Sequence, residues 1–443
     1  MSGRVIVIGA GMAGLSAAWA LSRQGIEVIV LDRENRVGGR VLSADIDGAP
    51  VELGAGFLAS FYPKTLRIAR DVGLVGGAAP APTRVAVLRD GRLRGVSGVQ
   101  LLSTPLIPFV SKLRLLKTVW TVIRRWGSLD QGAMWRAHRL DTRSVTAYAQ
   151  AVLDQKILDY VLEPGLRAYL YWEPEQTTQA MLFIMLKQAI GLRRVPVPGG
   201  RIAALPAALA QKVSVQLSTE VREVRSQAGG GYAVEVDMNG TAHTLTADGV
   251  VCATTATQVA RLFPELTDAQ RDFFAAIRYS ATIGVAIPAR SPVLRPFTDV
   301  LMPRRETPDL AAATRRLTDG PPGSVRDVLL LFASSEGARR LASADQAAVT
   351  ERLLADFRAA VPAFDTELEP GRSSVQRWPE ALPIFDVGHL RALRKFHEGQ
   401  YEVGAVVFAG DYLGGPFIEG AVTSGLAAAD RLRARMKKAA GKR

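Results

Sequence analysis

The chain has 443 residues, 48% of them hydrophobic, and a formal net charge of +13. This length excludes a single small module and suffices for two or three packed units of ordinary domain size. The basic charge fits a solvated Arg-rich surface, an anionic membrane or an acidic ligand, whereas the absence of interleaved aromatic and basic residues argues against nucleic acid as a partner.

Cysteine usage and the first apolar run set expectations about the compartment. Cys252 is the single cysteine, so an intrachain disulfide is excluded, and no CxxC or His-rich spacing predicts a metal site. The apolar run at residues 5–8 lacks the features of a signal peptide, and no uncharged apolar stretch reaches the ~18 residues of a membrane span. We expect a cytoplasmic protein, for which peripheral contact with a membrane stays open.

The first residues predict a dinucleotide-binding unit. Residues 4–8 are largely β-branched, which is typical of a strand buried on both faces, and a glycine turn and a helix-forming run at 15–21 follow. In such a unit the first glycine allows a tight turn, the second admits a pyrophosphate, and the third lets helix and strand pack closely. The expected cofactor contacts here are Gly9, Gly11, Met12, Ala13 and Gly14.

A second strand and a double glycine extend this motif. Residues 27–31 read as a strand that ends in Asp32, whose carboxylate can bond ribose hydroxyls. The sequence Arg36-Val37-Gly38-Gly39-Arg40 follows, with two glycines that let the backbone approach a ligand and two arginines that can neutralise a diphosphate. This segment favours FAD over NAD.

Together, the residues Gly9–Gly14, Asp32 and Arg36–Arg40 resemble the opening signature of the flavin amine oxidase, protoporphyrinogen oxidase and carotenoid desaturase superfamily. The chain is most similar to the branch of the protoporphyrinogen oxidases, although the acid at the Asp32 position is usually glutamate in the superfamily. The resemblance implies that residues 51–57 bring their backbone close to the isoalloxazine ring. It implies cofactor contacts at Arg33, Gly38, Gly39, Arg40, Gly54, Ala55, Gly56 and Phe57.

The middle of the chain resembles a return to the same domain. Residues 197–201 form a second glycine-marked block before a helix-like run at 202–209. Short strands are expected at 213–217 and 221–224, a hairpin at 232–245 closed near Asn239-Gly240, and a buried strand at 249–254. By resemblance, the backbone of Val221 contacts the adenine.

The carboxyl end carries a second signature of the resemblance. Residues 406–411 read as a buried strand that ends in an acid, and residues 418–425 open a helix. The acid can lie against ribitol or phosphate groups, and free amides at the helix start can face the O2 edge of the flavin. The expected contacts are Gly410, Asp411, Gly420, Ala421 and Val422.

These blocks predict an α/β fold with a discontinuous Rossmann-like FAD-binding domain at residues 1–75, 195–275 and 400–443. The intervening residues 76–194 and 276–399 are expected to form an α+β substrate-binding domain with a mixed sheet and helices. Cys252 lies in a predicted strand, away from the carboxyl end near the flavin, so we expect FAD to be bound non-covalently.

Within the substrate half, residues 111–126 contain no acid and place apolar residues at helical spacing. With the apolar residues before them, they resemble the membrane-facing region of superfamily members that take lipid-soluble substrates. Two alternatives stay open: peripheral membrane contact through residues 101–126, or an internal helix that packs on the substrate domain. The oligomeric state is open as well.

Aromatic residues are the candidates for the wall of an apolar substrate cavity, although core packing is an alternative for each of them. No catalytic residue is assigned, because the flavin carries most of the chemistry. The cavity candidates are Phe57, Tyr169, Tyr171, Trp378, Phe385 and Phe417.

Two departures from the amine oxidases weaken the interpretation of the chain as one of them, and one departure is that residues 412–417 offer no obvious aromatic cage beside Asp411. Amine-oxidising members often carry a lysine near flavin N5, whereas the matching segment at 277–285 has none. The sequence therefore favours dehydrogenation of a bulky, mostly apolar substrate such as a porphyrinogen, isoprenoid or polycyclic metabolite. Electrons would pass through FAD to oxygen or another acceptor. The alternatives are oxidation of a primary or secondary amine with release of peroxide, and a flavin-binding protein without net oxidation.

Overall fold

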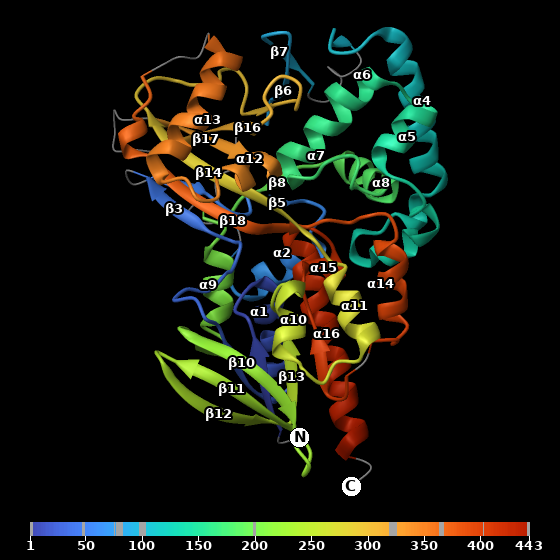
Figure 1. The fold of residues 1–443 in the computed structure, drawn as a ribbon, viewed down its shortest axis with the longest axis vertical. Coiled ribbons are helices and arrows are strands. Elements are labelled where there is room, and N and C mark those ends of the chain that lie inside the picture. The colour runs from blue at the N-terminus through green and yellow to red at the C-terminus, as the bar shows by residue number, and fades with distance from the viewer. Residues whose placement is uncertain are drawn as a thin grey trace.

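The computed structural model describes residues 3–46, 49–74, 76, 83–96, 103–197, 201–318, 326–362, 367–401 and 403–440. Of the segments discussed above, residues 198–200 and 101–102 lie outside these ranges. Figure 1 shows a parallel sheet with an antiparallel sheet beside it at one end of the molecule, where both termini lie, and a mixed sheet and a cluster of helices at the other. The predicted fold class is confirmed.

The parallel sheet has the strand order β19-β13-β1-β2-β9, and every neighbouring pair is parallel. Its strands alternate their side chains between two cores: Val5 and Val7 face one, and Ile6 and Ile8 face the other. Burial on both faces explains why β-branched residues dominate. The strands are β1 (Arg4–Ile8), β2 (Glu27–Leu31), β9 (Ser214–Gln216), β13 (Gly249–Cys252) and β19 (Val406–Phe408).

Two helices that are far apart in the sequence lie side by side on one face of this sheet. They are α1 (Met12–Ser22) and α16 (Ile418–Ala440). Their contact is close because Gly425 has no side chain: a Cβ there would lie 2.2 Å from the Ala13 carbonyl oxygen. The two ends of the chain therefore form one layer. Other helices near the sheet are α2 (Pro63–Asp71), α9 (Ala204–Ala210), α10 (Ala256–Leu262), α11 (Asp268–Ala275), α14 (His389–His397) and α15 (Asp411–Gly414).

The predicted hairpin is confirmed as part of a three-stranded antiparallel sheet in the order β10-β11-β12. Asn239 and Gly240 both have positive φ angles, 53° and 85°, as a tight hairpin turn requires. The strands are β10 (Thr219–Ser226), β11 (Tyr232–Met238) and β12 (Thr241–Ala247).

A seven-stranded mixed sheet forms the core of the other half, in the order β18-β14-β17-β16-β15-β6-β7. Helices α12 (Ser335–Arg340) and α13 (Gln346–Ala360) cover one face. The other face packs on the short strands β3 (Ser43–Ile46) and β4 (Ala49–Glu52) from the amino-terminal part of the chain. The seven strands are β6 (Val85–Arg89), β7 (Arg92–Gly95), β14 (Tyr279–Ala289), β15 (Asp299–Leu301), β16 (Leu310–Thr318), β17 (Arg326–Ala333) and β18 (Ser374–Pro383).

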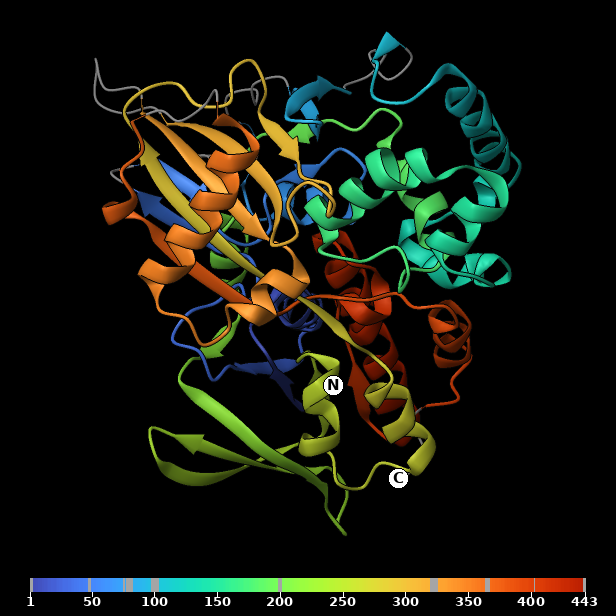
Figure 2. The same ribbon diagram turned by 45° about the horizontal axis from the view of Figure 1, so that its top comes forward.

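Helices beside the mixed sheet complete this half (Figure 2). Side-chain caps begin several of them: Ser144 accepts from the Ala147 amide at α5, and Thr178 accepts from the Ala180 amide at α8. The elements are α4 (Phe109–Arg124), α5 (Val145–Val152), α6 (Gln155–Ile157), α7 (Glu163–Leu170), α8 (Gln179–Ala189), the short helices η1 (Trp126–Ser128), η2 (Gln131–Leu140), η3 (Leu158–Leu162) and η6 (Pro370–Arg372), and the strand pair β5 (Leu58–Ala59) and β8 (Arg194–Val195).

Helix α4 packs on α8 but turns most of its apolar side chains outward, so it lies on the surface of the substrate half and not inside it. Peripheral membrane contact through this segment stays a prediction. The buried residues of α4 are Ser111, Thr118 and Val122, and the Thr118 hydroxyl lies 2.8 Å from the Tyr148 hydroxyl. By contrast, Phe109 is 72% exposed and Trp120 59% exposed. In the described part of the chain, no helix combines the length and the hydropathy that a membrane crossing requires.

Candidate functional site

The turn between β1 and α1 shows why its glycines are needed. Gly9 has a φ of 107°, and a Cβ at Gly14 would lie 1.9 Å from the Gly9 carbonyl oxygen. A Cβ at Gly11, by contrast, would have no atom within 4 Å. Gly9 and Gly14 are thus fixed by the packing of the chain, whereas Gly11 leaves an open approach to the backbone.

The start of α1 suits an anion. Gly11 is the N-cap and provides no side-chain hydrogen bond, and the first turn holds no acidic residue. The amides of Met12, Ala13 and Gly14 therefore stand at a helix amino end without a side-chain cap, where the helix dipole favours negative charge. These residues fit the diphosphate of a dinucleotide.

Asp32 holds the glycine turn in place. Its Oδ2 accepts a hydrogen bond from the Ala10 amide at 2.6 Å, and its Oδ1 accepts from the Glu34 amide at 2.9 Å. Strand β10 begins beside it, since the Thr219 amide donates to the Asp32 carbonyl oxygen at 2.8 Å. Val221 follows two residues later, with its side chain buried. The contacts of Asp32 with ribose and of Val221 with adenine stay predictions.

The double glycine lies against the first turn. The Gly38 amide donates to the Ala10 carbonyl oxygen at 2.9 Å, and Gly38 and Gly39 have φ angles of 103° and 55°. A Cβ at Gly39 would lie 3.4 Å from the Gly11 Cα atom. Arg33, another predicted contact, is exposed and pairs with Glu34 at 3.4 Å. The loop that contains Gly38 and Gly39 thus limits, on one side, the access of a ligand to the Gly11 backbone.

Arg40 and Asp411 join the two ends of the chain. Arg40 Nη2 donates to Asp411 Oδ1 at 2.9 Å, Nη1 lies 2.8 Å from Oδ2, and Nη1 also donates to the Ala381 carbonyl oxygen at 2.9 Å. Burial opposes the charge of Arg40, but the neighbouring Asp411 carboxylate raises its pKa above the ordinary value. The pair brings together two predicted cofactor residues from distant segments.

Residues 54–57 run beside Arg40. The Ala55 amide donates to the Arg40 carbonyl oxygen at 3.1 Å, and a Cβ at Gly54 would lie 2.1 Å from that same oxygen. Trp378 Nε1 donates to the Leu53 carbonyl oxygen at 2.7 Å and so ties β18 to this segment. The mixed sheet is thereby held against the backbone that we expect beside the isoalloxazine ring.

The remaining aromatic candidates differ in how far their side chains are buried. Tyr171, which ends α7 with a φ of 57°, has its ring 6.3 Å from the Phe332 ring. Phe57 lies under Arg194 at 4.9 Å, Phe417 lies 6.0 Å from the Phe61 ring, and Tyr169 is 39% exposed. Phe385 differs, because it has no exposed surface and packs on Trp172 and His389. The structure therefore places Phe385 in the core and not on a cavity wall.

The carboxyl-terminal turn is built by close packing. A Cβ at Gly420 would lie 2.1 Å from the Gly415 carbonyl oxygen, and the Gly410 amide donates to Ser424 Oγ at 2.9 Å. The amides of Gly420 and Ala421 both donate to the Phe417 carbonyl oxygen, at 2.9 and 3.2 Å. The expectation that these two amides are free is wrong, because the turn before α16 uses them. Val422 is fully buried in the core beneath this turn.

Two charged residues at this site escaped the sequence analysis. Glu52 is buried, accepts from Ser43 Oγ at 2.8 Å and from the Ile202 amide at 2.9 Å, and burial raises its pKa to about 7. Arg316 on β16 reaches Gly56, where an added Cβ would lie 3.8 Å from Arg316 Nη2. Glu52 lies in the segment 51–57 noted above, but no local signal marks Arg316.

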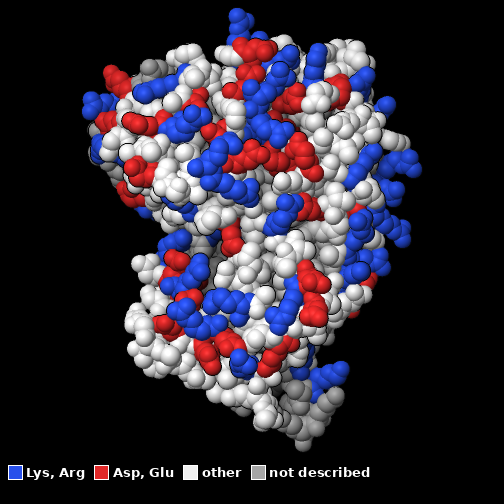
Figure 3. Space-filling view, viewed as in Figure 1, with Lys and Arg blue, Asp and Glu red and all other residues white. Residues whose placement is uncertain are grey.

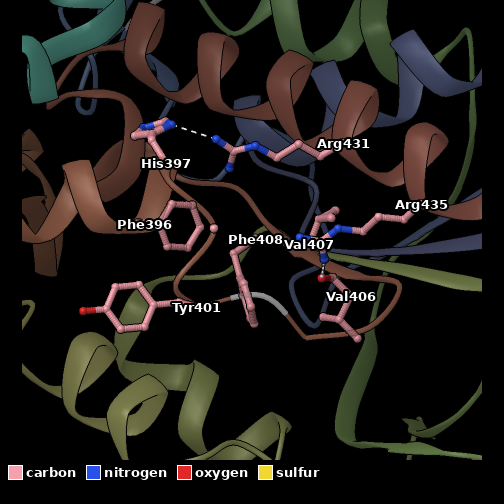
Figure 4. A pocket seen from close by; sticks show the side chains of 9 residues that line it. Phe396, His397, Tyr401, Val406, Val407, Phe408, Arg431 and Arg435 are labelled. Carbon is pink, nitrogen blue, oxygen red and sulfur yellow. Dashed lines mark hydrogen bonds between the residues drawn. The ribbon is translucent and has the colours of Figure 1, made fainter. Parts of the chain in front are cut away.

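A small pocket at another place in the molecule is shown in Figure 4. All three residues of β19 line it, and Asp411, which follows the carboxyl end of that strand, does not. Arg431 Nη2 lies 2.7 Å from His397 Nδ1, and burial together with the Arg431 charge lowers the pKa of His397 to about 4. Arg435 Nη1 donates to the Val406 carbonyl oxygen at 2.9 Å. These groups connect parts of the chain, and the pocket includes none of the predicted cofactor residues.

A parallel sheet with a glycine turn and an acid after its second strand, with a mixed sheet docked beside them, defines a protein of the dinucleotide-binding class. The family model described as flavin containing amine oxidoreductase matches residues 12–433, and the chain belongs to this family. It is thus a flavin-dependent oxidoreductase, and FAD is its cofactor.

The relatives include proteins named as amine oxidases and proteins named as porphyrinogen oxidases. A Mycobacterium tuberculosis protein assigned as a flavin-containing monoamine oxidase is 29% identical over 53% of this chain and 53% of its own length. A coproporphyrinogen III oxidase of Propionibacterium freudenreichii is 32% identical over 24% of this chain and 21% of its own length. The chain thus spans about half the length, or less, of these curated relatives.

Among solved structures, putrescine oxidase bound to putrescine has a TM-score of 0.78 at 19% identity, covering 98% of this chain and 100% of that one. A structure from Exiguobacterium named as a protoporphyrinogen oxidase has a TM-score of 0.74 at 18% identity, covering 98% of this chain and 99% of that one. At these identities the likeness shows the fold alone.

Proposed function

We propose that this chain dehydrogenates a bulky, mostly apolar substrate such as a porphyrinogen, an isoprenoid or a polycyclic metabolite. Bound FAD would accept a hydride at N5 and be reoxidised by oxygen or another acceptor. The protein would hold the cofactor through the amino end of α1 and the residues around Arg40 and Asp411, and would orient the substrate against residues 54–57.

The observation that carries this proposal is the face of the mixed sheet beside Leu53. A Cβ at Gly284, in the middle of β14, would lie 3.2 Å from the Phe332 ring and 3.8 Å from Leu53 Cδ2. A larger side chain at position 284 would press on the Phe332 ring, and β14 contains no lysine. Trp378, Thr282 and Phe332 share this face, because residues directly opposite in the ladder point the same way. An aromatic wall without an amine suits an apolar substrate better than a small amine.

The experiment is an anaerobic titration of the purified holoenzyme. Denaturation should release FAD, and a true substrate should bleach the flavin absorbance. Porphyrinogens, isoprenoids and polycyclic compounds form one arm of the screen, and primary and secondary amines with peroxide detection form the other. Turnover of simple amines, without turnover of any compound in the first arm, would contradict this proposal. It would favour the alternative of an amine oxidase, which the structural likeness to putrescine oxidase also supports.

We also propose peripheral contact of α4 with an anionic membrane surface. Leu113, Leu116, Val119 and Ile123 are 48 to 59% exposed and join the exposed Phe109 and Trp120 on one outer surface. Basic residues flank this surface and no acid lies between 111 and 126. Figure 3, in the view of Figure 1, shows mostly basic side chains along the edge where α4 lies. Apolar insertion with basic flanks matches a lipid surface of negative charge and would give access to a lipid-soluble substrate.

A further inference from the structure

The face of the mixed sheet that meets residues 51–57 carries a cation, Arg316, close to this segment. Arg316 lies opposite Val328 in the β16–β17 ladder, and Val328 packs in the same cluster as Val51 and Leu53. The Arg316 guanidinium therefore points to the side of the sheet that faces the FAD-binding segment. Its Nη2 would lie 3.8 Å from a Cβ at Gly56, the exposed glycine in that segment.

Among the described residues, no carboxylate forms an ion pair with Arg316. Its hydrogen bond is a long one, from Nη1 to the Arg315 carbonyl oxygen at 3.5 Å. The nearby Asp299 already binds Arg194 Nη2 at 2.9 Å and the Thr298 hydroxyl at 2.8 Å. Burial, and then the like charge of Arg194, lower the pKa of Arg316. The guanidinium keeps most of its hydrogen-bond donors for another partner.

The charge around Arg316 is not balanced by Glu52. That carboxyl group is bound by Ser43 and the Ile202 amide, and burial raises its pKa to about 7, so it carries only part of a negative charge near neutral pH. Arg194 lies beside the same site, over the Phe57 ring at 4.9 Å. Two guanidinium groups thus face one fully engaged carboxylate and one partly protonated carboxyl group.

We propose that Arg316, assisted by Arg194, binds a carboxylate of the substrate beside Gly56, Phe57 and Tyr169. Such a substrate would be an organic acid with a bulky apolar body, because the aromatic face takes the body and the guanidinium the acid. A cationic amine would be repelled at this position. The inference rests on the proposed function, since it places the substrate against residues 54–57.

The test compares naphthoate with naphthamide, two probes of the same shape that differ in charge. Each is titrated into the holoenzyme, and the dissociation constant is read from the change in flavin absorbance. We expect naphthoate to bind about tenfold tighter or more, and Arg316→Gln to remove this preference without weakening naphthamide. The matched control is Arg290→Gln, which removes an exposed arginine paired with Glu369 just after the end of β14 and should keep the preference.

Three results would overturn the proposal. The first is a wild-type holoenzyme that binds the two probes equally, a comparison that needs no variant. The second is an Arg316→Gln variant that keeps the full preference for naphthoate. The third is an Arg316→Gln variant that releases FAD while the remaining holoenzyme keeps the preference, which would make Arg316 a cofactor contact. Arg316→Lys, which retains the charge and loses the planar fork, should give an intermediate preference.

The carboxylate site at Arg316 and the proposed function can be disproved separately. A holoenzyme that prefers naphthoate through Arg316 but turns over only amines would support the carboxylate site and contradict the dehydrogenation proposal. A holoenzyme that bleaches with neutral polycyclic compounds and ignores the carboxylate would do the reverse.

Discussion

Glu52 couples the site to pH at the scale of a single residue. Burial raises its pKa from 4.5 to about 7, so between these values the folded chain holds a proton that the unfolded chain releases. The free energy of unfolding should therefore fall as the pH rises from 4.5 to 7. Glu52→Gln should remove about 1–3 kcal/mol of this fall, because the amide does not ionise.

Urea unfolding of the apoprotein at pH 5 and pH 8, followed by circular dichroism, measures this difference. The control is Glu27→Gln, which changes a glutamate that is 74% exposed and should leave the pH dependence as in the wild type. If Glu52→Gln and the wild type lose the same stability between the two pH values, Glu52 is charged in the folded chain throughout.

Asp32 gives a second prediction for one side chain. Its carboxylate holds the Ala10 and Glu34 amides and is expected to bind the ribose, so Asp32→Ala should weaken FAD binding about 5- to 150-fold, as the loss of ~1–3 kcal/mol implies. Isothermal titration of apoprotein with FAD measures the affinity. Asp71→Ala on α2, away from the glycine turn, should have no effect, and an unchanged affinity in Asp32→Ala would exclude the ribose contact.

At the scale of the element, α4 carries the membrane prediction. Replacing Leu116 and Trp120 together by Glu places two charges on the exposed apolar surface and should abolish co-sedimentation with vesicles of phosphatidylglycerol and phosphatidylcholine. Wild-type binding should be weaker to pure phosphatidylcholine, because the basic flanks then lose their partner. Val387→Glu, at an apolar residue that is 41% exposed outside α4, is the control.

Two outcomes would contradict a membrane role for α4. The first is a double variant that binds vesicles as the wild type does. The second is a dimer of the wild type in light scattering that the double variant lacks, which would assign the surface to a second copy of the chain.

The elements also show what the sequence could and could not predict. Strands β1 and β2 and the hairpin of β11 and β12 follow from local patterns, so their positions were predicted closely. The spacing in α4 identified its apolar face. It did not predict whether this face is buried or exposed, because that depends on packing. Arg316 was missed for a similar reason: only the register of β16 with β17 brings it to the face beside Gly56.

At the scale of the whole molecule, distant segments meet in one layer. Glu419 accepts from the Thr65 amide at 2.9 Å and from its hydroxyl at 2.7 Å, and Arg40 pairs with Asp411 across 371 positions of sequence. Neither end of the chain completes the predicted cofactor site alone. Such a site forms only when both ends have folded together, so binding of the cofactor should stabilise the molecule as a whole.

This linkage predicts that FAD raises the melting temperature of the apoprotein in a concentration-dependent way. At a free FAD concentration of about 100 times the dissociation constant, the stabilisation should be ~2.7 kcal/mol, and a further tenfold increase should add ~1.4 kcal/mol. Thermal unfolding followed by circular dichroism measures the shift. NAD serves as the control, since it shares the adenine, the adenosine ribose and the diphosphate but lacks the ribitol and the isoalloxazine ring that residues 54–57 are expected to contact. An equal shift with NAD would mean that the glycine turn alone binds the dinucleotide, and that the carboxyl-terminal segment contributes nothing to the choice of FAD.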